Sequence, residues 1–239
     1  MKKFLIFATL VIIASSCSNN PSSTSGNVAL KASAVSTTGK TSLTSRTAAS
    51  TVIITDFKVN IGNIKFETDM EDAMHSTDPE HSDVKLNGPF LLDLLDPNKP
   101  LSQLIANVDI PDAKYEEIKF MFTKSTAVGD MLGKTYMIKG TLNGKEFMIW
   151  SDKDVELEID FMDPSKDFTV GTTGITLTVK MQLDALMARL TLLANQGLLL
   201  DTDGDGIIEI STNNDDGHLI FGGEIKDLLE SETHLDDHD

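Results

Sequence analysis

Alternating apolar and polar positions dominate the middle of the chain and predict β-strands there. From Thr51 the alternation continues to Ile61, and its phase shifts by one residue after Gly62. Alternation is typical of a strand with one buried face, and a phase shift at a glycine indicates a bulge. Later stretches repeat the pattern: Ile118–Phe122, Tyr136–Leu142, Lys145–Trp150, Val155–Phe161 and Ile175–Met181.

Turn and helix signals complete the expected order of elements. Asn143-Gly144 separates two alternating stretches and predicts a two-residue hairpin. After Met181 the apolar spacing changes from two to 3.6 residues, which predicts a helix that Gly197 would end. A second short helix is expected around Glu224–Glu230. We therefore predict a mainly β fold, an antiparallel β-sandwich followed by a C-terminal helix, an acidic loop and a second short helix.

The composition along the chain divides it into five segments. We expect a lipoprotein signal peptide over residues 1–16, a flexible tether over 17–27, a β-sandwich domain over 28–182, a helical appendage with a calcium-type loop over 183–231 and an acidic tail over 232–239. The segment Val28–Val35 fits either a first strand or more linker.

The first residues indicate export and lipid attachment. Two lysines precede an uncharged apolar run, Phe4–Ala14, which is too short to span a bilayer. Small residues then lead to Cys17, the single cysteine of the chain. We interpret this as a bacterial lipobox, with cleavage before Cys17 and acylation of that residue. The alternative is ordinary secretory cleavage beside an incidental cysteine.

The residues after Cys17 favour the outer membrane of a Gram-negative cell. Ser18 is not the aspartate that commonly retains lipoproteins in the inner membrane. The stretch Ser18–Pro21 also lacks the acidic run that some groups use for surface export. We therefore expect the periplasmic face rather than the cell surface.

The charge balance limits the classes of partner. The 239 residues include 37 acids and 20 bases, for a net charge of −17, and no acid precedes Asp56. Such a chain is repelled by nucleic acids and by anionic membranes, so its membrane contact would be the lipid on Cys17. The stretch before Asp56 reads as a neutral tether, with contact to lipid headgroups as the alternative.

An acidic loop after the first predicted helix is the best candidate site. Asp201, Asp203 and Asp205 alternate, and Gly206 follows them, as in the first part of an EF-hand-type loop. We predict calcium there, held by oxygens of five residues: Asp201, Asp203, Asp205, Ile207 (backbone carbonyl) and Glu209.

The same loop departs from the EF-hand pattern at its end. Thr212 stands at the twelfth position, where a bidentate glutamate is usual. The closing oxygen would come from Glu209, Asp215 or Asp216. A solvated acidic turn without metal is the alternative.

Function is less well defined by the sequence than location is. Trp150 alternates out of phase with Phe147 and Ile149, which suggests an exposed face that stacks on a sugar ring; a partly buried sheet aromatic is the alternative. We take Trp150 and Tyr136 as candidate contacts for a glycan. No nucleophile–base motif or phosphate-binding loop occurs. We therefore expect a non-catalytic binding or adhesion module for a glycan or an envelope protein. The alternatives are a structural envelope component and a carboxylate-based hydrolase.

Several segments resemble bacterial lipoproteins of the domain-of-unknown-function 4382 family. The likeness is carried by Asp56–Ile61, Leu92–Leu95, Tyr115–Lys119, Lys139–Phe147 and Gly204–Ser211, and it covers most of the chain after Thr51. The resemblance implies a β-rich envelope domain. It implies no activity and supplies no catalytic residues.

Overall fold

The computed structural model describes most of the chain beyond residue 24. The described residues are 25–35, 43–46, 51–68, 83–95, 103–160, 168–171, 173–211, 216, 219–231 and 233–235. The expected signal peptide, Cys17 and the last four residues of the acidic tail lie outside them.

The described residues form strands in the first two thirds of the chain and a mixture of helices and strands after that. In chain order the elements are β1 Ser25–Val35, β2 Leu43–Arg46, β3 Thr51–Thr68, β4 Val84–Asp93, β5 Gln103–Pro111, β6 Lys114–Phe122, β7 Tyr136–Leu142, β8 Lys145–Ser151, β9 Val155–Asp160, β10 Phe168–Thr169, β11 Ile175–Gln182, α2 Asp184–Asn195, β12 Ile207–Ser211, α3 Leu219–Ser231 and β13 Thr233–Leu235.

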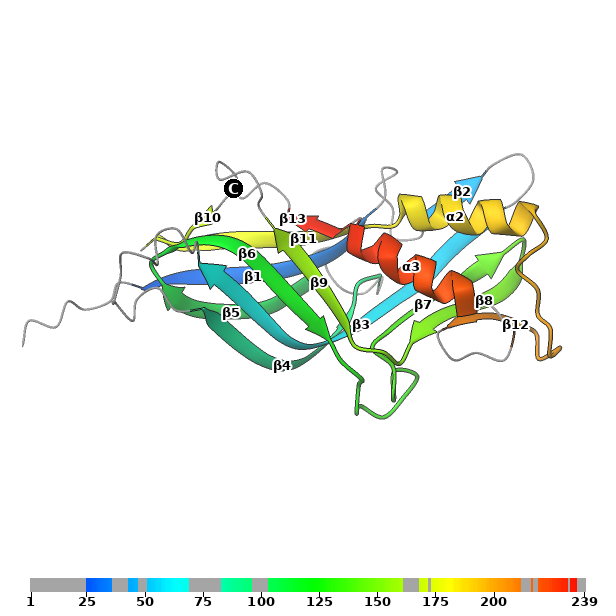
Figure 1. The fold of residues 1–239 in the computed structure, drawn as a ribbon, viewed down its shortest axis with the longest axis horizontal. Coiled ribbons are helices and arrows are strands. Elements are labelled where there is room, and N and C mark those ends of the chain that lie inside the picture. The colour runs from blue at the N-terminus through cyan, green and yellow to red at the C-terminus, as the bar shows by residue number, and fades with distance from the viewer. Residues whose placement is uncertain are drawn as a thin grey trace, which may run out of the picture.

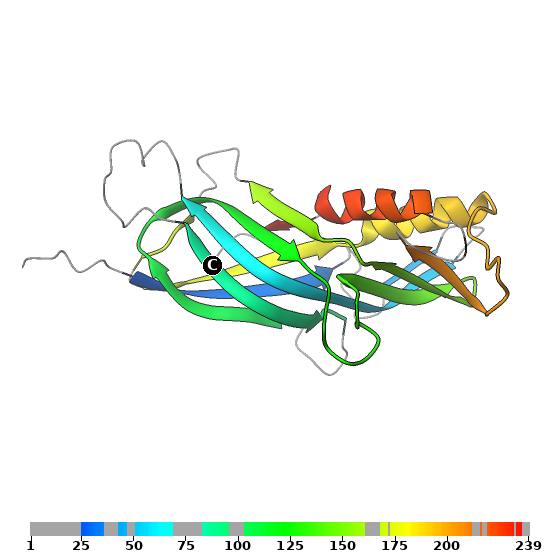
Figure 2. The ribbon, with the colours of Figure 1, turned by 60° about the horizontal axis from the view of Figure 1, so that its bottom comes forward.

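These strands build two sheets, as the alternation predicts. The smaller sheet has the order β13-β11-β1-β5, and the larger has β10-β6-β3-β7-β8-β12 with β2, β4 and β9 paired beside it. The smaller sheet packs on one half of the larger one, while α2 and α3 cover the other half (Figures 1 and 2). The fold is therefore a mainly β, sandwich-like arrangement with helices completing one layer.

The long strand β3 connects the two halves. Along one edge it pairs first with β7 and then with β6, both antiparallel. Asn60 joins the two pairings, because its backbone N–H donates to Thr135 and its carbonyl accepts from the N–H of Thr123. The chain between these two threonines leaves the sheet as a loop. Figures 1 and 2 show this green loop projecting away from the helices.

One continuous apolar core runs under both halves. It includes Phe57, Phe66 and Phe120 from the larger sheet, Leu177 from the smaller sheet and Leu190 from α2. Burial of this apolar surface is what stabilises the two layers against each other. None of the described helices is long and apolar enough to cross a membrane.

Several local predictions are confirmed. Asn143 and Gly144 both have positive φ, +53° and +82°, as a two-residue hairpin of type I′ requires. The register of β3 shifts between Ile61 and Asn63, which places the bulge at Gly62. Helix α2 ends before Gly197, which has φ +69°.

The structure differs from the sequence-based picture in pairing and in segmentation. Strand β1 begins at Ser25, inside the expected tether, because it pairs with β5 from its first residue. Two pairings are parallel, β1 with β11 and β8 with β12, so the sandwich is not purely antiparallel. The expected appendage and the expected acidic tail each add a strand to the sheets, since β12 joins the larger sheet and β13, which lies in the expected tail, joins the smaller one.

Candidate functional site

The acidic loop between α2 and β12 brings three predicted ligands together. One carboxylate oxygen from each of Asp201, Asp203 and Asp205 lies within 4.8 Å of the other two. The loop can curl this tightly because Gly204 and Gly206 have φ of +82° and +100°, which side-chain-bearing residues rarely adopt. Figure 1 shows the loop in orange at one end of the long axis, opposite the start of β1.

Backbone N–H groups hold these carboxylates in place. Asp201 accepts hydrogen bonds from Gly204 (2.7 Å) and Gly206 (3.2 Å). Asp203 accepts from the N–H of Asp205 (3.0 Å), and Asp205 accepts from that of Ile207 (2.7 Å). The side chains are therefore fixed by the turn itself, which is the preorganisation that an ion site requires.

The spacing of the three oxygens fits a calcium ion. Calcium–oxygen bonds are about 2.4 Å, so two ligands of one ion can lie up to ~5 Å apart. In the structure a lysine from the β7–β8 hairpin supplies positive charge instead, because Lys145 Nζ lies 2.8 Å from Asp201 Oδ2. The Lys145 ammonium beside Asp201 holds the pKa of that carboxyl below its usual value.

A further aspartate fastens the loop to the strand that follows. The buried carboxylate of Asp216 accepts from the N–H of Thr202 (2.7 Å) and from that of Glu209 (2.6 Å). Burial alone would raise the pKa of Asp216, but these N–H groups lower it below its usual value. Asp216, one of the three closing residues that the sequence leaves open, thus ties the start of the loop to β12.

Glu209, the fifth predicted ligand, lies outside the group that the three aspartates form. Its Oε1 accepts a hydrogen bond of 3.1 Å from the indole N–H of Trp150. Lys134 Nζ lies 5.4 Å from the centroid of the same indole. Two residues predicted for separate sites, one for metal and one for glycan, therefore bind each other across β8 and β12.

Tyr136, the second predicted glycan contact, is in the core. It is 1% exposed and lies on the face of β7 opposite to the one that carries Trp150 on β8. Burial raises the pKa of its hydroxyl. The structure therefore does not bring Tyr136 and Trp150 to one surface, and Tyr136 is not accessible to a glycan.

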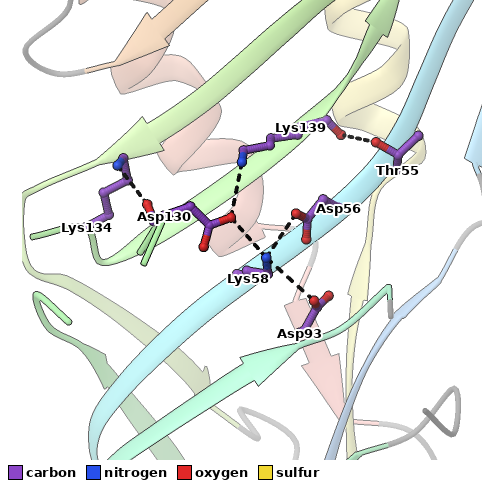
Figure 3. Close-up of polar contacts among 7 residues, drawn as sticks. All are labelled: Thr55, Asp56, Lys58, Asp93, Asp130, Lys134 and Lys139. Carbon is purple, nitrogen blue, oxygen red and sulfur yellow. Dashed lines mark hydrogen bonds and ion pairs between the residues drawn. The ribbon is translucent and has the colours of Figure 1, made fainter. Parts of the chain in front are cut away.

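A second group of charges, which the sequence analysis missed, lies on the outer face of the larger sheet, away from the core. Lys58 on β3 is central: its Nζ lies 3.1 Å from Asp130, 3.2 Å from Asp56 and 3.8 Å from Asp93. Asp130 also accepts from Lys139 at 3.1 Å (Figure 3). Burial would lower the pKa of Lys58, but its bonds to Asp130 and Asp56 raise it above the usual value.

These ion pairs hold down the loop that projects between β6 and β7. Lys134 donates from its ammonium to the backbone carbonyl of Asp130 (2.8 Å, Figure 3). Met131 is buried, whereas Val128 and Leu132 remain 98% and 57% exposed. A cleft of about 280 Å³ lies between this loop, Lys58 and the end of β4. Another, of about 290 Å³, lies over β7 and β8 beside Thr55 and Lys139.

A third charged group on the outer face is a carboxyl cluster farther along β3, β6 and β9. Glu117 is 7% exposed and lies 2.9 Å from the ammonium of Lys119, which also contacts Glu67. Burial raises the pKa of Glu117 to about 8, and the neighbouring carboxyls of Glu158 and Glu67 add to the rise. The bond from Lys65 keeps the pKa of Glu67 well below its usual range. Glu117 and Glu67 line neither of the two clefts described above.

Comparison of this chain with protein families, with curated proteins and with solved structures found no match.

Proposed function

We propose that this protein is a lipid-anchored, non-catalytic binding module of the cell envelope, and that calcium fastens its C-terminal part. The observation that carries the calcium assignment is the convergence of the Asp201, Asp203 and Asp205 carboxylates within 4.8 Å. Three carboxylates held this close repel one another unless positive charge lies between them. The Lys145 ammonium contacts Asp201 and can balance only one of these three negative charges.

Oxygen-only ligands favour calcium over the transition metals. Asp201, Asp203 and Asp205 would supply carboxylate oxygens and Ile207 its backbone carbonyl, while water would complete the shell. Calcium would supply charge neutralisation rather than chemistry at a substrate. Since the loop lies between α2 and β12, its ordering would strengthen the parallel pairing of β12 with β8.

Hydrogen exchange tests the structural role of the ion. We expect about 5 mM calcium, well above the Kd of 10⁻⁴–10⁻³ M typical of extracellular sites, to slow exchange in β12 of the full chain. Magnesium at the same concentration should do less, because its smaller shell demands octahedral geometry. Asp203→Asn should lose the effect. Equal exchange in β12 with and without calcium would refute the role.

The anchor is the second part of the proposal. The residues around Cys17 support acylation there and retention at the periplasmic face of the outer membrane. Metabolic labelling with a clickable fatty acid tests it: wild type should be labelled, and Cys17→Ala should not. Equal labelling of the two chains would exclude Cys17 as the lipid site.

An envelope protein is a better-supported partner than a glycan. Stacking on a sugar ring requires an open aromatic face, and Lys134 lies over Trp150 while Glu209 takes its N–H. Neither cleft is lined by Trp150 or Tyr136. The β6–β7 loop, held in place by the ion pairs of Asp130, instead presents the exposed apolar side chain of Val128, which is of the kind that protein interfaces bury. A glycan-array screen with no hits alongside a cross-linked envelope protein would agree with this choice, whereas saturable glycan binding would reverse it.

Membership in the domain-of-unknown-function 4382 family is a proposal of the same kind. The segments from Asp56 to Ser211 that resemble the family include parts of β3, β7 and β8, which form the centre of the larger sheet. A structural component without any ligand is the alternative that these tests would leave if both calcium and partner binding failed.

A further inference from the structure

The cleft beside the β6–β7 loop has the features of a prepared binding site. Its walls come from three separate parts of the chain: Lys58 on β3, Leu91 and Asp93 on β4, and Val128 and Asp130 on the loop. Its volume of about 280 Å³ is just below the range of about 300–1,000 Å³ that small-molecule pockets occupy. This size fits one anchoring side chain better than a whole small molecule or an oligosaccharide.

The loop wall of this cleft is rigidly held. Asp130 bonds to Lys58 and Lys139, and its carbonyl accepts from Lys134 (Figure 3). Backbone hydrogen bonds close the base of the loop, from Ser125 to Lys134 and from Gly133 to Ser125. A partner would therefore lose little free energy in ordering this wall.

The charges of the cleft select a cation. Lys58 already meets three carboxylates, so an anionic ligand would have to displace them from its ammonium. Three carboxylates, those of Asp56, Asp93 and Asp130, outnumber the two ammonium groups that bond to them, those of Lys58 and Lys139. The Asp130 side chain remains 44% exposed and can accept a further hydrogen bond. The net charge of −17 steers a basic partner toward the whole molecule.

The rim of the cleft is apolar on two sides. Leu91 is 45% exposed and Val128 is 98% exposed, although neighbouring residues of the same loop and strand are buried. A long basic side chain combines an aliphatic stem with a charged end, so it matches apolar rims above a carboxylate floor.

We propose that this cleft docks an arginine or lysine side chain of a partner protein. The stem would pack against Leu91 and Val128, and the charged end would reach Asp93 and Asp130. This proposal rests on the proposed function as a binding module and names the surface and the partner chemistry. It does not rest on calcium, since none of its residues belongs to the Asp201–Asp205 loop.

Panning with a random peptide library displayed on phage tests the proposal on the full chain in detergent. We expect the selected peptides to share an arginine or lysine next to apolar residues. Val128→Lys places an ammonium on the rim and should weaken their binding about tenfold or more. Leu132→Lys is the matched control, because Leu132 is exposed on the same loop but does not line the cleft. It should change binding less than about twofold.

The outcomes separate this proposal from the calcium assignment. Asp203→Asn should keep the selected peptides bound, since it alters only the acidic loop. Loss of binding in Asp203→Asn but not in Val128→Lys would place the peptide site at the acidic loop and overturn the cleft. Three other results would also overturn the cleft proposal: the selected peptides are acidic or purely aromatic, Val128→Lys and Leu132→Lys lose peptide binding equally, or no peptide is enriched.

Discussion

The acidic loop and the Lys58 cleft both gather aspartates, but they balance the charge in opposite ways. In the loop, the carboxylates of Asp201, Asp203 and Asp205 face one another and accept from backbone N–H groups, and the Lys145 ammonium contacts Asp201. In the cleft, Asp130 lies between two ammonium groups, those of Lys58 and Lys139.

The difference shows that the partner of a carboxylate, more than the number of carboxylates, decides what a site can bind. Carboxylates bonded to lysines are largely neutralised, so the small excess of negative charge at the cleft suits one basic side chain rather than a divalent ion. Carboxylates that converge on each other leave a negative centre, which a divalent cation fills. This difference is the basis for proposing calcium at the loop and a basic side chain at the cleft.

Removing one aspartate from each region should have unequal effects on stability. Asp216→Ala leaves the N–H groups of Thr202 and Glu209 without their acceptor in a largely buried place, and we expect a loss of about 2 kcal/mol. Asp130→Ala removes exposed ion pairs and should cost about 0–1 kcal/mol. Urea unfolding measures both. Equal losses would mean that the two kinds of carboxylate contact stabilise the fold alike.

Glu117 on β6 gives a third case for comparison, a buried carboxyl whose neighbours include other carboxyls. The pKa of Glu117 is about 8 in the folded protein, against an ordinary value of 4.5. Below about pH 4.5, Glu117 is protonated in both the folded and the unfolded state. Between pH 4.5 and pH 8 it is protonated in the folded state only, so the free energy of unfolding falls as the pH rises through this window.

Glu117→Gln removes this dependence. We expect its melting temperature to exceed that of wild type by roughly 2–5 °C at about pH 8 and to match it at about pH 5. Glu158→Gln is the control, since it removes one neighbour but leaves the buried carboxyl in place, and it should show a smaller pH-dependent gain. A constant difference between Glu117→Gln and wild type at both pH values would show that Glu117 ionises normally.

The weakest expected effect concerns the lysine at the loop. Lys145→Gln removes the ammonium that competes for Asp201, so calcium affinity should rise about two- to fivefold. Lys139→Gln, which removes a partner of Asp130 in the other region, should leave calcium affinity unchanged. Calcium titrations of the two variants make the comparison. A fall in affinity in Lys145→Gln would mean that this lysine supports the site.

The features that sequence predicts well are those set by neighbouring residues. The alternation from Thr51 to Ile61, the Asn143-Gly144 turn and the three aspartates of the loop all depend on spacing within a few positions. The structure keeps each of them. Local patterns carry this information because side-chain direction and turn conformation are properties of short segments.

The features that sequence does not predict depend on which strands become neighbours. Lys58 meets Asp130 across 72 positions, and Trp150 meets Glu209 across 59. The first contact depends on where the β6–β7 loop lies over β3 and the second on the register of β8 and β12, and no local spacing encodes either of them. Glu209 illustrates this, because the parallel pairing of β12 with β8 turns its side chain toward Trp150 rather than toward the three aspartates with which it was predicted to bind metal.

Calorimetric titration with calcium tests the central assignment most directly. The full chain should bind calcium with a Kd of about 10⁻⁴–10⁻³ M; Asp203→Asn should weaken binding tenfold or more, and Asp130→Asn should leave it unchanged. Identical titrations of wild type and Asp203→Asn, or a loss of binding confined to Asp130→Asn, would contradict the assignment of calcium to the loop.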